Sequence, residues 1–417
     1  MSNRGETVNI AIFTNSYLPF SGGVPTSIKT FKNAAEKLGH TVIVFAPSYP
    51  GHKSNGKGVI RIPSVKAMTY AGFYLPVPFS TEITKAFRRY DFDIVHVQHP
   101  YLLGETGMKM ARKYNIPLVF TYHTMYEQYL HYLPVAESIA NPVMRKFTTS
   151  FCNHSDLVIA PSEHVKEFLS KRNIETSIKV VPTGIELRPY RKKFRKGSIK
   201  RKHRIPQASK LLIYAGRITP EKNLKFLVKC MAKIAKKDPD VMCMLIGKSA
   251  EKDHYEYDLK DIVKREGMED RIMFIGDVPH DKLIDYYKEA DLFLFASKTE
   301  TQGLVILEAM AAGTPVIAVD APAISEFING KNGFTVPQNM LKFTAKALSM
   351  LRDKKRMKQM SSNALKTAKK HSAENMAKKL IAEFRKVKPT QDEYENMRSL
   401  KDLSEIDWSD VIKKIMR

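Results

Sequence analysis

The sequence predicts an α/β protein of two domains, each built around a parallel β-sheet with helices on both faces. Three observations support this fold class. The chain has 417 residues, which exceeds the length of a typical single domain. Short apolar runs alternate with helical patterns, and the alternation restarts after a strongly basic stretch near residue 200. Both halves therefore have the pattern of a Rossmann-like domain.

The first domain opens with an apolar run at residues 8–14, a helical pattern from about Thr26 to Leu38 that Gly39 closes, and a second run at 41–47. This strand, helix, strand order is typical of two parallel neighbouring strands. Four further runs follow, at residues 93–98, 117–123, 156–162 and 178–184. We therefore expect one α/β domain over residues 1–185.

The second domain follows a basic segment, residues 186–210, which is expected to be a linker. Five apolar runs then alternate with helical patterns, at residues 210–216, 241–247, 271–277, 291–297 and 314–320. They predict a second α/β domain over residues 211–370. Residues 371–417 are expected to form a helical tail, including an amphipathic stretch around Trp408, that returns to the N-terminal domain.

The formal net charge is +25, and the 186–210 segment contributes much of it, with eleven Lys and Arg residues against one acidic residue. Such an excess attracts nucleic acid, phosphates or an anionic membrane. A solvated linker would explain the segment equally well. Because each cation near an anionic leaflet contributes roughly 1 kcal/mol, we predict that the segment contacts an anionic membrane surface.

Cysteine usage and hydropathy indicate the compartment. The three cysteines, Cys152, Cys230 and Cys243, form no close pair and no zinc-type spacing, which argues against disulfides and a structural metal. The most apolar stretch, residues 303–319, contains Glu308 and a Gly-Thr-Pro turn, so no membrane span is expected. We expect a cytoplasmic protein attached peripherally to the inner face of the plasma membrane.

Two cations follow the first strand of the second domain. Arg217 and Lys222 lie five residues apart in the sequence GRITPEKN, at a strand-to-helix turn. Ligands of parallel sheets bind beyond the carboxyl ends of the strands, and a diphosphate is suited to an Arg and a Lys there. Both residues are therefore candidates for binding a pyrophosphate, although cations at a helix start are also common surface features.

A second motif follows a later strand of the same domain. Glu300 and Glu308 are separated by seven residues across a loop that opens a helix at Gly303, Leu304 and Val305. The free N–H groups at such a helix start form an anion site. A glutamate pair alone usually means only a solvated helix. Together with Arg217 and Lys222 at a nearby strand end, it predicts a site for a nucleotide sugar.

The first domain supplies three more candidates. Gly22 and Gly23 lie in the turn after the first strand, where glycines allow a ligand to approach the backbone, and Pro25 is near the start of the next helix. A plain tight turn would also explain them. The turn lacks the GxGxxG pattern, which disfavours a nicotinamide dinucleotide. His123 ends the PLVFTYH run and is a candidate ligand contact, with a structural histidine as the alternative.

The sequence Asp91-Phe92-Asp93 matches the DxD pattern of metal-dependent sugar transferases. These carboxylates precede a strand and are expected at its amino end, away from the ligand edge. The sequence therefore gives no metal-binding residues, and no metal or other cofactor is expected.

The motifs together resemble the retaining glycosyltransferases of family 4, which have the GT-B fold. The similarity runs from SGGVPTS through TYHT, APSEHV, VPTGIEL and GRITPEKN to ETQGLVILEAMAAGTPVIA. It implies that Arg217 and Lys222 bind the donor diphosphate, Glu308 the ribose and Glu300 the transferred sugar, with His123, Gly22 and Gly23 completing the site. It also implies two domains facing across a cleft, and metal-independent transfer with retention.

The acceptor is suggested by aromatic and basic segments at residues 66–79 and 122–132, which suit a membrane interface or core packing. The stretch TYHTMYEQYLHYLP resembles that of bacterial diacylglycerol glucosyltransferases, which use UDP-glucose. We expect glucose transfer to 1,2-diacylglycerol. Phosphatidylinositol mannosyltransferases and other lipid or polysaccharide transferases share the motifs and remain alternatives.

Two hypotheses of other classes are a nucleotide-sugar epimerase and a basic nucleic-acid-binding protein. An epimerase would convert the sugar nucleotide with no lipid present. The nucleic-acid hypothesis leaves the sugar-nucleotide motifs unexplained, and the chain shows no RRM, KH or zinc-finger signature. We therefore expect no nucleic-acid partner.

Overall fold

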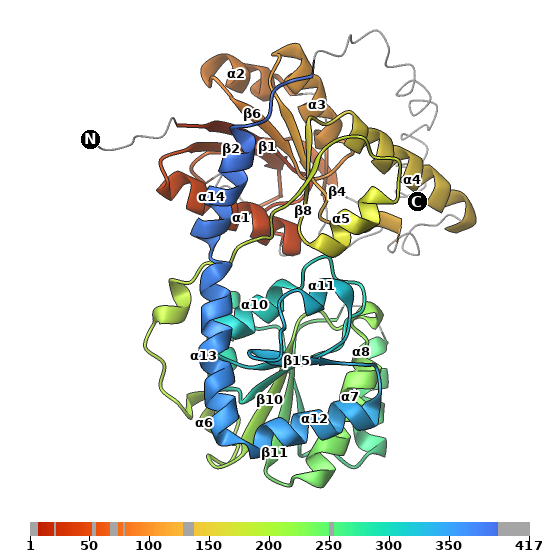
Figure 1. Cartoon of the computed structure of the whole chain (residues 1–417), viewed down its shortest axis with the longest axis vertical. Coiled ribbons are helices and arrows are strands. Elements are labelled where there is room, and N and C mark those ends of the chain that lie inside the picture. Colours follow the sequence, from red (N-terminus) through yellow and green to blue (C-terminus); the bar gives the residue numbers. More distant parts are fainter. Residues whose placement is uncertain are drawn as a thin grey trace. The chain divides into compact units, whose positions relative to one another are not determined.

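The computed structural model describes residues 7–20, 22–51, 56–66, 74–77, 80–127, 137–249 and 254–390. The chain divides into two compact units. The first consists of Met1–Gly184 together with Ala373–Arg417, and the second of Ile185–Ser372. Each unit contains its own parallel sheet, which confirms the predicted fold class of two Rossmann-like domains (Figure 1).

The described part of the first unit contains a seven-stranded parallel sheet in the order β3-β2-β1-β6-β7-β8-β9. Its strands are β1 (Asn9–Phe13), β2 (Thr41–Pro47), β3 (Val59–Ile62), β6 (Ile94–Val97), β7 (Leu118–Thr121), β8 (Leu157–Ala160) and β9 (Ile178–Val180). A separate antiparallel pair joins β4 (Ser64–Lys66) to β5 (Tyr74–Pro76).

Helices cover both faces of this sheet. They are α1 (Gly23–Lys37), α2 (Thr81–Arg89), α3 (Leu103–Lys113), α4 (Glu137–Asn153), α5 (Glu163–Ser170) and α14 (Ala373–Phe384). Because side chains alternate along a strand, β1 contributes to two cores. Ile10 and Ile12 pack in the core that α1 and α14 share, and Ala11 and Phe13 pack in the core that includes residues of α2 to α5.

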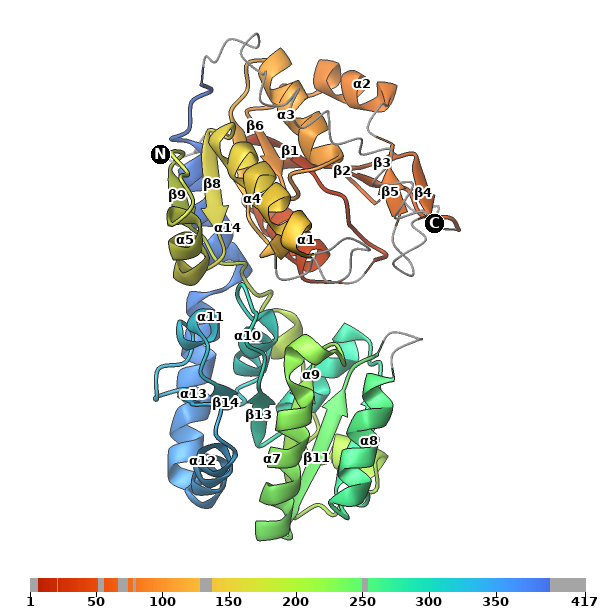
Figure 2. The same cartoon turned by 90° about the vertical axis from the view of Figure 1, so that its right-hand side faces the viewer.

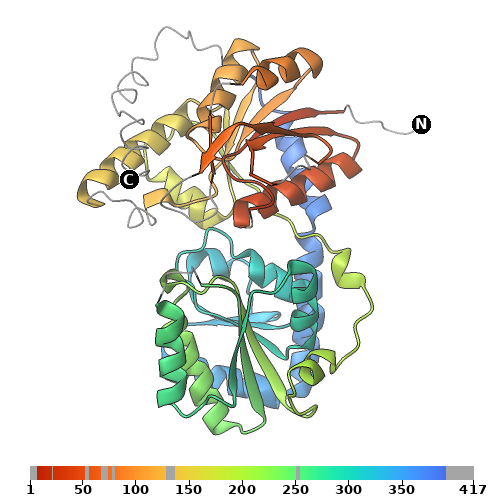
Figure 3. The same cartoon turned by 180° about the vertical axis from the view of Figure 1, so that it is seen from behind.

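Helix α14 packs against α1, and Figures 1 and 3 show the two side by side. The C-terminal chain therefore does return to the N-terminal unit, as predicted. Residues 391–417, which include Trp408, lie outside the described residues.

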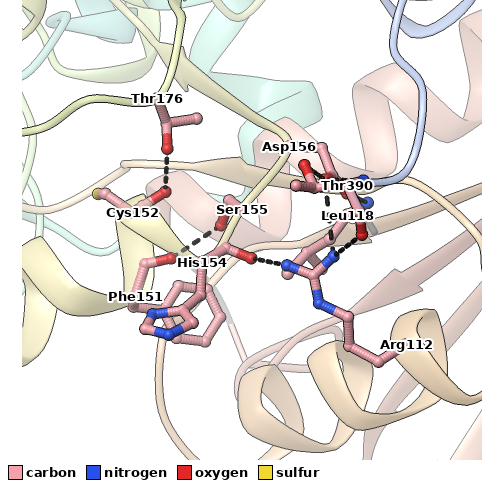
Figure 4. Close-up of polar contacts among 9 residues, drawn as sticks. All are labelled: Arg112, Leu118, Phe151, Cys152, His154, Ser155, Asp156, Thr176 and Thr390. Carbon is pink, nitrogen blue, oxygen red and sulfur yellow. Dashed lines mark hydrogen bonds and ion pairs between the residues drawn. The ribbon is translucent and has the colours of Figure 1, made fainter. Parts of the chain in front are cut away.

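A polar cluster holds the segment after α14 (Figure 4). The Asp156 carboxylate precedes β8 and accepts hydrogen bonds from the Thr390 backbone N–H at 2.8 Å and from the Leu118 N–H at 2.6 Å. Arg112 of α3 donates to the Thr390 carbonyl at 3.1 Å and lies 3.6 Å from the same carboxylate. An ionised hydrogen-bonding partner makes such contacts stronger than those between neutral groups. The cluster thus fixes the returning chain at the amino ends of β7 and β8.

The described part of the second unit contains a six-stranded parallel sheet in the order β12-β11-β10-β13-β14-β15. The strands are β10 (Lys210–Ala215), β11 (Val241–Ile246), β12 (Ile272–Gly276), β13 (Leu292–Phe295), β14 (Val316–Val319) and β15 (Gly333–Val336). The strand order reverses between β10 and β13, and ligands of doubly wound sheets bind at such a reversal, beyond the carboxyl ends of the strands.

Two groups of helices cover this sheet. Helices α7 (Leu224–Lys237), α8 (Tyr255–Arg265) and α12 (Met340–Arg352) pack together, and Figure 2 shows α7 beside α8. Helix α10 (Leu304–Ala311) packs with α9 (His280–Glu289) and α13 (Lys354–Lys370), and α11 spans Pro322–Ser325. Side-chain caps begin α12 and α13, because Asn339 and Asp353 accept backbone N–H bonds there.

The basic segment 186–210 is part of the second unit, so the expectation of a separate linker was wrong. It forms the 3-10 turn η2 (Pro189–Arg191) and helix α6 (Ser198–Lys202). Buried Glu289 of α9 accepts hydrogen bonds from the N–H groups of Gly197 at 2.9 Å and Ile199 at 3.2 Å. Tyr190, Ile199 and Ile205 are buried in the core of this unit. These contacts with distant residues tether the segment, and its composition alone does not reveal them.

Candidate functional site

The loop after β10 carries the two predicted cations. Arg217 lies two residues beyond the end of β10 at Ala215, and its guanidinium lies 3.2 Å from the Glu221 carboxylate. The Arg217 carbonyl accepts a hydrogen bond from the Tyr214 hydroxyl at 2.9 Å. Lys222 ends the 3-10 turn η3 (Pro220–Lys222), just before α7. Both cations therefore lie at the carboxyl edge of the second sheet, where the strand order reverses.

Lys222 forms an ion pair with Glu300, which lies on the loop after β13, the strand next to β10. The Lys222 Nζ and Glu300 Oε1 atoms are 2.5 Å apart, and the two side chains are 13% and 16% exposed. Burial raises the pKa of Glu300, but the charge of Lys222 and hydrogen bonds from Lys222 and Ser297 outweigh it, so the net shift is downward. Glu300 is thus an ionised carboxylate at the sheet edge.

Glu308 lies in the fifth position of α10, about one turn into the helix. Tyr287 donates its hydroxyl hydrogen to Glu308 Oε2 at 3.0 Å, and His280 Nε2 lies 3.0 Å from Oε1. Burial and the nearby carboxylate raise the pKa of Tyr287, so the phenol keeps its hydrogen. These contacts fix the direction of the carboxylate while leaving it further acceptor capacity.

Helix α10 begins directly after Gly303, whose φ of 75° lies in the left-handed region that favours glycine. The N–H groups of the first helical turn, which includes Leu304 and Val305, have no acceptor within the helix. They lie on the same loop-to-helix connection as Glu300. This arrangement can bind an anion at the helix start.

Three buried hydroxyl groups that the sequence did not reveal lie on loops at the same edge. Among the described residues, the side-chain oxygens of Thr219, Ser249 and Thr299 are buried without a hydrogen-bond partner. They follow β10, β11 and β13. Buried polar atoms are nearly always paired, so orphaned hydroxyls indicate places where a ligand or water binds. Serine and threonine in loops are too common for the sequence to mark these three.

In the first unit, His123 lies two residues beyond β7, at the carboxyl edge of that sheet. Its Nε2 atom is 2.7 Å from Gln98 Oε1, and burial lowers the pKa of His123 to about 4. The imidazole is therefore neutral at pH 7. His123 and Gln98 line a cavity together with His96, Thr121 and residues of α1 and α14.

Further polar residues join the carboxyl ends of β1 and β6. The backbone N–H of Asn15 donates to His99 Nδ1 at 3.2 Å, and the Asn15 side chain accepts from the Leu103 N–H at 3.1 Å. Asn15, Gln98 and His99 were not identified from the sequence. The signal available was a polar cluster, HVQHP, directly at the end of an apolar run.

The glycine pair precedes and begins α1, so this helix starts three residues earlier than expected. Gly22 has extended backbone and accepts the N–H of Thr26, and Gly23 is the first residue of the helix. A Cβ atom added to Gly23 would meet nothing within 4 Å. No protein atom lies close to the position that a side chain would occupy here, so there is room for a ligand near the backbone.

The remaining predictions concern metals, cysteines and membranes. Asp93 accepts the Asn9 N–H at 2.7 Å at the amino end of β6, the position expected for the rejected DxD sequence. Within the described ranges, no group of three or more His, Cys, Asp or Glu side chains is arranged to hold a metal ion. Cys152, Cys230 and Cys243 are buried free thiols. No helix in the described part of the chain is long and apolar enough to cross a bilayer.

Of the aromatic segments predicted to face a membrane, residues 67–73, 78–79 and 128–132 lie outside the described residues. Tyr122 and Tyr126, in the described part of the second segment, are buried in the core of the first unit. Core packing, the alternative raised from the sequence, accounts for these two.

Comparison with known proteins places two family models on the chain. The model of glycosyl transferases group 1 matches residues 195–367, and that of glycosyltransferase family 4 matches residues 21–188. The alpha-monoglucosyldiacylglycerol synthase of Streptococcus pneumoniae is 34% identical over 78% of this chain and 74% of its own. The protein of the same name from Acholeplasma laidlawii is 30% identical over 80% of this chain and 85% of its own.

Solved structures share the fold at lower identity. Sucrose-phosphate synthase from Thermosynechococcus elongatus superposes with a TM-score of 0.74 and 20% identity, over 91% of this chain and 98% of its own. Anabaena Alr3699/HepE, solved in complex with UDP and glucose, gives a TM-score of 0.73 and 18% identity, over 91% of this chain and all of its own.

Proposed function

The chain belongs to the glycosyltransferases of group 1 and family 4, with the GT-B fold, and from this premise we propose that it transfers glucose from UDP-glucose to 1,2-diacylglycerol with retention of configuration. The observation that carries the proposal is the 34% identity to a monoglucosyldiacylglycerol synthase over most of both chains. The ionised carboxylate of Glu300 and its partner Lys222, at the edge of the second sheet, support the part of the proposal that concerns the nucleotide-sugar donor.

We assign the donor as follows. Arg217 and Lys222 bind the diphosphate, helped by the N–H groups at Gly303, Leu304 and Val305. Glu300 accepts from hydroxyls of the transferred sugar, and Glu308 accepts from the ribose through the acceptor capacity that Tyr287 and His280 leave. By the resemblance to the family, His123, Gly22 and Gly23 of the first unit are assigned to the donor as well.

The chemistry is a substitution at the anomeric carbon of the sugar. The bond from that carbon to the diphosphate oxygen breaks, the acceptor hydroxyl oxygen bonds to the same face, and the acceptor proton passes to the leaving phosphate. Arg217 and Lys222 stabilise the negative charge that develops on the diphosphate, which is the role of preorganised cations in transfer reactions. In this proposal the cations supply the stabilisation and no metal ion is required.

The basic segment supports the proposal of an anionic membrane surface as a partner. Between residues 191 and 204 its exposed cations are Arg191, Lys192, Lys193, Arg195, Lys196, Arg201, Lys202 and Arg204. Lys200 differs from these, because it is buried and donates to the carbonyls of Gln207 at 3.1 Å and Ser209 at 2.6 Å. We propose that the exposed cations hold the enzyme at the cytoplasmic face of the plasma membrane.

Replacing these eight exposed cations by glutamine, with Lys200 retained, is expected to weaken binding to anionic vesicles by at least tenfold, because each cation contributes roughly 1 kcal/mol or less. Sedimentation with vesicles containing 30% phosphatidylserine measures this. The matched control replaces exposed cations of α12 and α13 by glutamine: Arg352, Lys354, Lys355, Arg356, Lys358, Lys366, Lys369 and Lys370. Equal loss in both variants, or equal binding of the wild type to neutral vesicles, would remove the segment's assigned role.

The competing functions give different products in one experiment. The protein is incubated with labelled UDP-glucose, UDP-galactose or GDP-mannose, and with diacylglycerol, phosphatidylinositol, polysaccharide primers or no acceptor. The proposal predicts a glucolipid from UDP-glucose and diacylglycerol. Mannosylated phosphatidylinositol would support the mannosyltransferase alternative, and conversion of the sugar nucleotide without any acceptor would support an epimerase. Nucleic acid is expected to leave the rate unchanged.

A further inference from the structure

Gln98 and His123 form a buried pair at the carboxyl edge of the first sheet. Gln98 directly follows β6, and its backbone N–H donates to the Phe13 carbonyl at 3.0 Å, which ties it to the end of β1. Its side chain is buried, and Oε1 lies 2.7 Å from His123 Nε2. The amide is thus held rigidly against the imidazole.

The direction of this bond decides which imidazole nitrogen carries hydrogen. An amide oxygen only accepts, so His123 Nε2 must donate, and Nδ1 is left with its lone pair. The other amide atom, Gln98 Nε2, is buried and has no hydrogen-bond partner among the described residues. The opposite amide orientation would place a donor against Nε2 and require the other tautomer. The two orientations therefore predict opposite roles for Nδ1.

The neighbouring titratable groups leave this bond undisturbed. Burial, followed by the proximity of His123, lowers the pKa of both His96 and His99 to about 3. His96 Nε2 is engaged at 2.6 Å with the Thr121 hydroxyl, and His99 Nδ1 accepts the Asn15 N–H at 3.2 Å. Both neighbours are neutral at pH 7 and have partners of their own.

We propose that Gln98 is a positioning residue that holds His123 as the Nε2–H tautomer, so that His123 Nδ1 accepts a hydrogen bond from a hydroxyl of the transferred sugar. This role rests on the proposed function, because it assigns the sugar as the partner of Nδ1. The tautomer itself is a property of the protein without donor and can be measured separately.

The first test is the ¹⁵N spectrum of protein labelled at histidine, with the His123 signals identified by their loss in the His123→Asn variant. At pH 7 the wild type is expected to show a protonated Nε2 and an unprotonated Nδ1 for His123. The Gln98→Leu variant is expected to show a mixture of tautomers, because no acceptor remains. A protonated Nδ1 in the wild type, or an unchanged tautomer in Gln98→Leu, would overturn the proposal.

The second test is the pH dependence of kcat. Gln98→Leu is expected to lower kcat about 10- to 100-fold at every pH, which is the size of loss seen when metal-binding histidines lose the partners that orient them. Gln98→Glu keeps an acceptor but places a carboxylate beside the imidazole, which favours the charged imidazolium. That cation has no lone pair on Nδ1.

Gln98→Glu is therefore expected to approach wild-type activity at pH 8.5 and to lose this activity as the pH falls toward 6. The acid limb of its profile of kcat against pH should lie at least one pH unit above that of the wild type. Gln338→Glu, the same change at an exposed position, is the control and is expected to follow the wild type. Equal pH profiles for Gln98→Glu and Gln338→Glu would refute the role. If no variant transfers sugar to lipid, the proposed function fails, and the ¹⁵N spectra still decide the tautomer.

Discussion

Replacing Lys222 or Glu300 with alanine is expected to lower the rate of sugar transfer about a thousandfold, because each variant removes a preorganised charged group from the proposed donor site. Lys222→Ala also removes the charge that holds the pKa of Glu300 below its ordinary value. In that variant the carboxyl pKa rises, since burial then acts without its counterion. The two single variants and the double variant should therefore be strongly non-additive.

The measurement is the release of UDP from UDP-glucose in the presence of diacylglycerol micelles, with a thermal melt of each variant. Glu300→Gln keeps the shape of the side chain and separates loss of charge from loss of packing. The matched control is Lys225→Ala, which breaks an exposed ion pair of 2.7 Å with Asp258 in the same unit. Because both side chains are exposed, that ion pair is expected to contribute little to stability. Full activity in Lys222→Ala, with an unchanged melt, would refute the site.

The second large effect is expected at Gly247, which directly follows β11. A Cβ atom there would lie 1.8 Å from the Gly216 carbonyl oxygen, and the Gly247 φ of 149° is unfavourable for other residues. Gly216 immediately precedes Arg217, so the displaced backbone belongs to the loop that carries the cations. Gly247→Ala is expected to cost about 3 kcal/mol or more, as overpacking against an unyielding backbone does.

A loss of this size corresponds to a Tm lower by roughly 6–12 °C for a unit of this length. Differential scanning calorimetry measures the Tm, and titration calorimetry with UDP is expected to show weaker binding. Gly276→Ala is the control, because Gly276 ends β12 with a φ of 76° and a Cβ there would meet nothing within 4 Å. Gly276→Ala is expected to lower the free energy of unfolding only by the cost of a left-handed backbone conformation at alanine, about 1–2 kcal/mol. Equal melts for the two variants would contradict the steric account.

Apolar runs located the central strands of both sheets because each buried strand is apolar on both faces, and the ends of these strands were predicted to within two residues. The outer strands β3 and β15 were missed. Arg61 interrupts β3, and its guanidinium donates to the Leu18 and Pro47 carbonyls, which the local pattern does not reveal. Gly333 begins β15 so close to β14 that a Cβ atom would lie 2.3 Å from the Val316 carbonyl oxygen.

The candidate site likewise has features that the sequence predicts and features that it does not. Strand ends place Arg217, Lys222, Glu300 and Glu308 at one sheet edge, so their grouping followed from the topology. The hydrogen-bond partners of the site residues could not be predicted from the topology. The hydroxyl of Tyr287 and the imidazole of His280 reach Glu308 from α9, and Gln98 reaches His123 from the neighbouring strand. These contacts depend on side-chain directions and on packing between elements, which residue types and spacing do not specify.

We propose that the protein transfers glucose from a nucleotide sugar to a lipid. One measurement tests it directly: incubation of the wild-type protein with radiolabelled UDP-glucose and diacylglycerol micelles, followed by extraction into organic solvent and determination of the anomeric configuration of the product. We expect label in the organic phase as an α-glucoside of diacylglycerol, and about a thousandfold less label with Glu300→Ala. Label that remains wholly in the aqueous phase with active wild-type enzyme, or a β-glucoside, would contradict it.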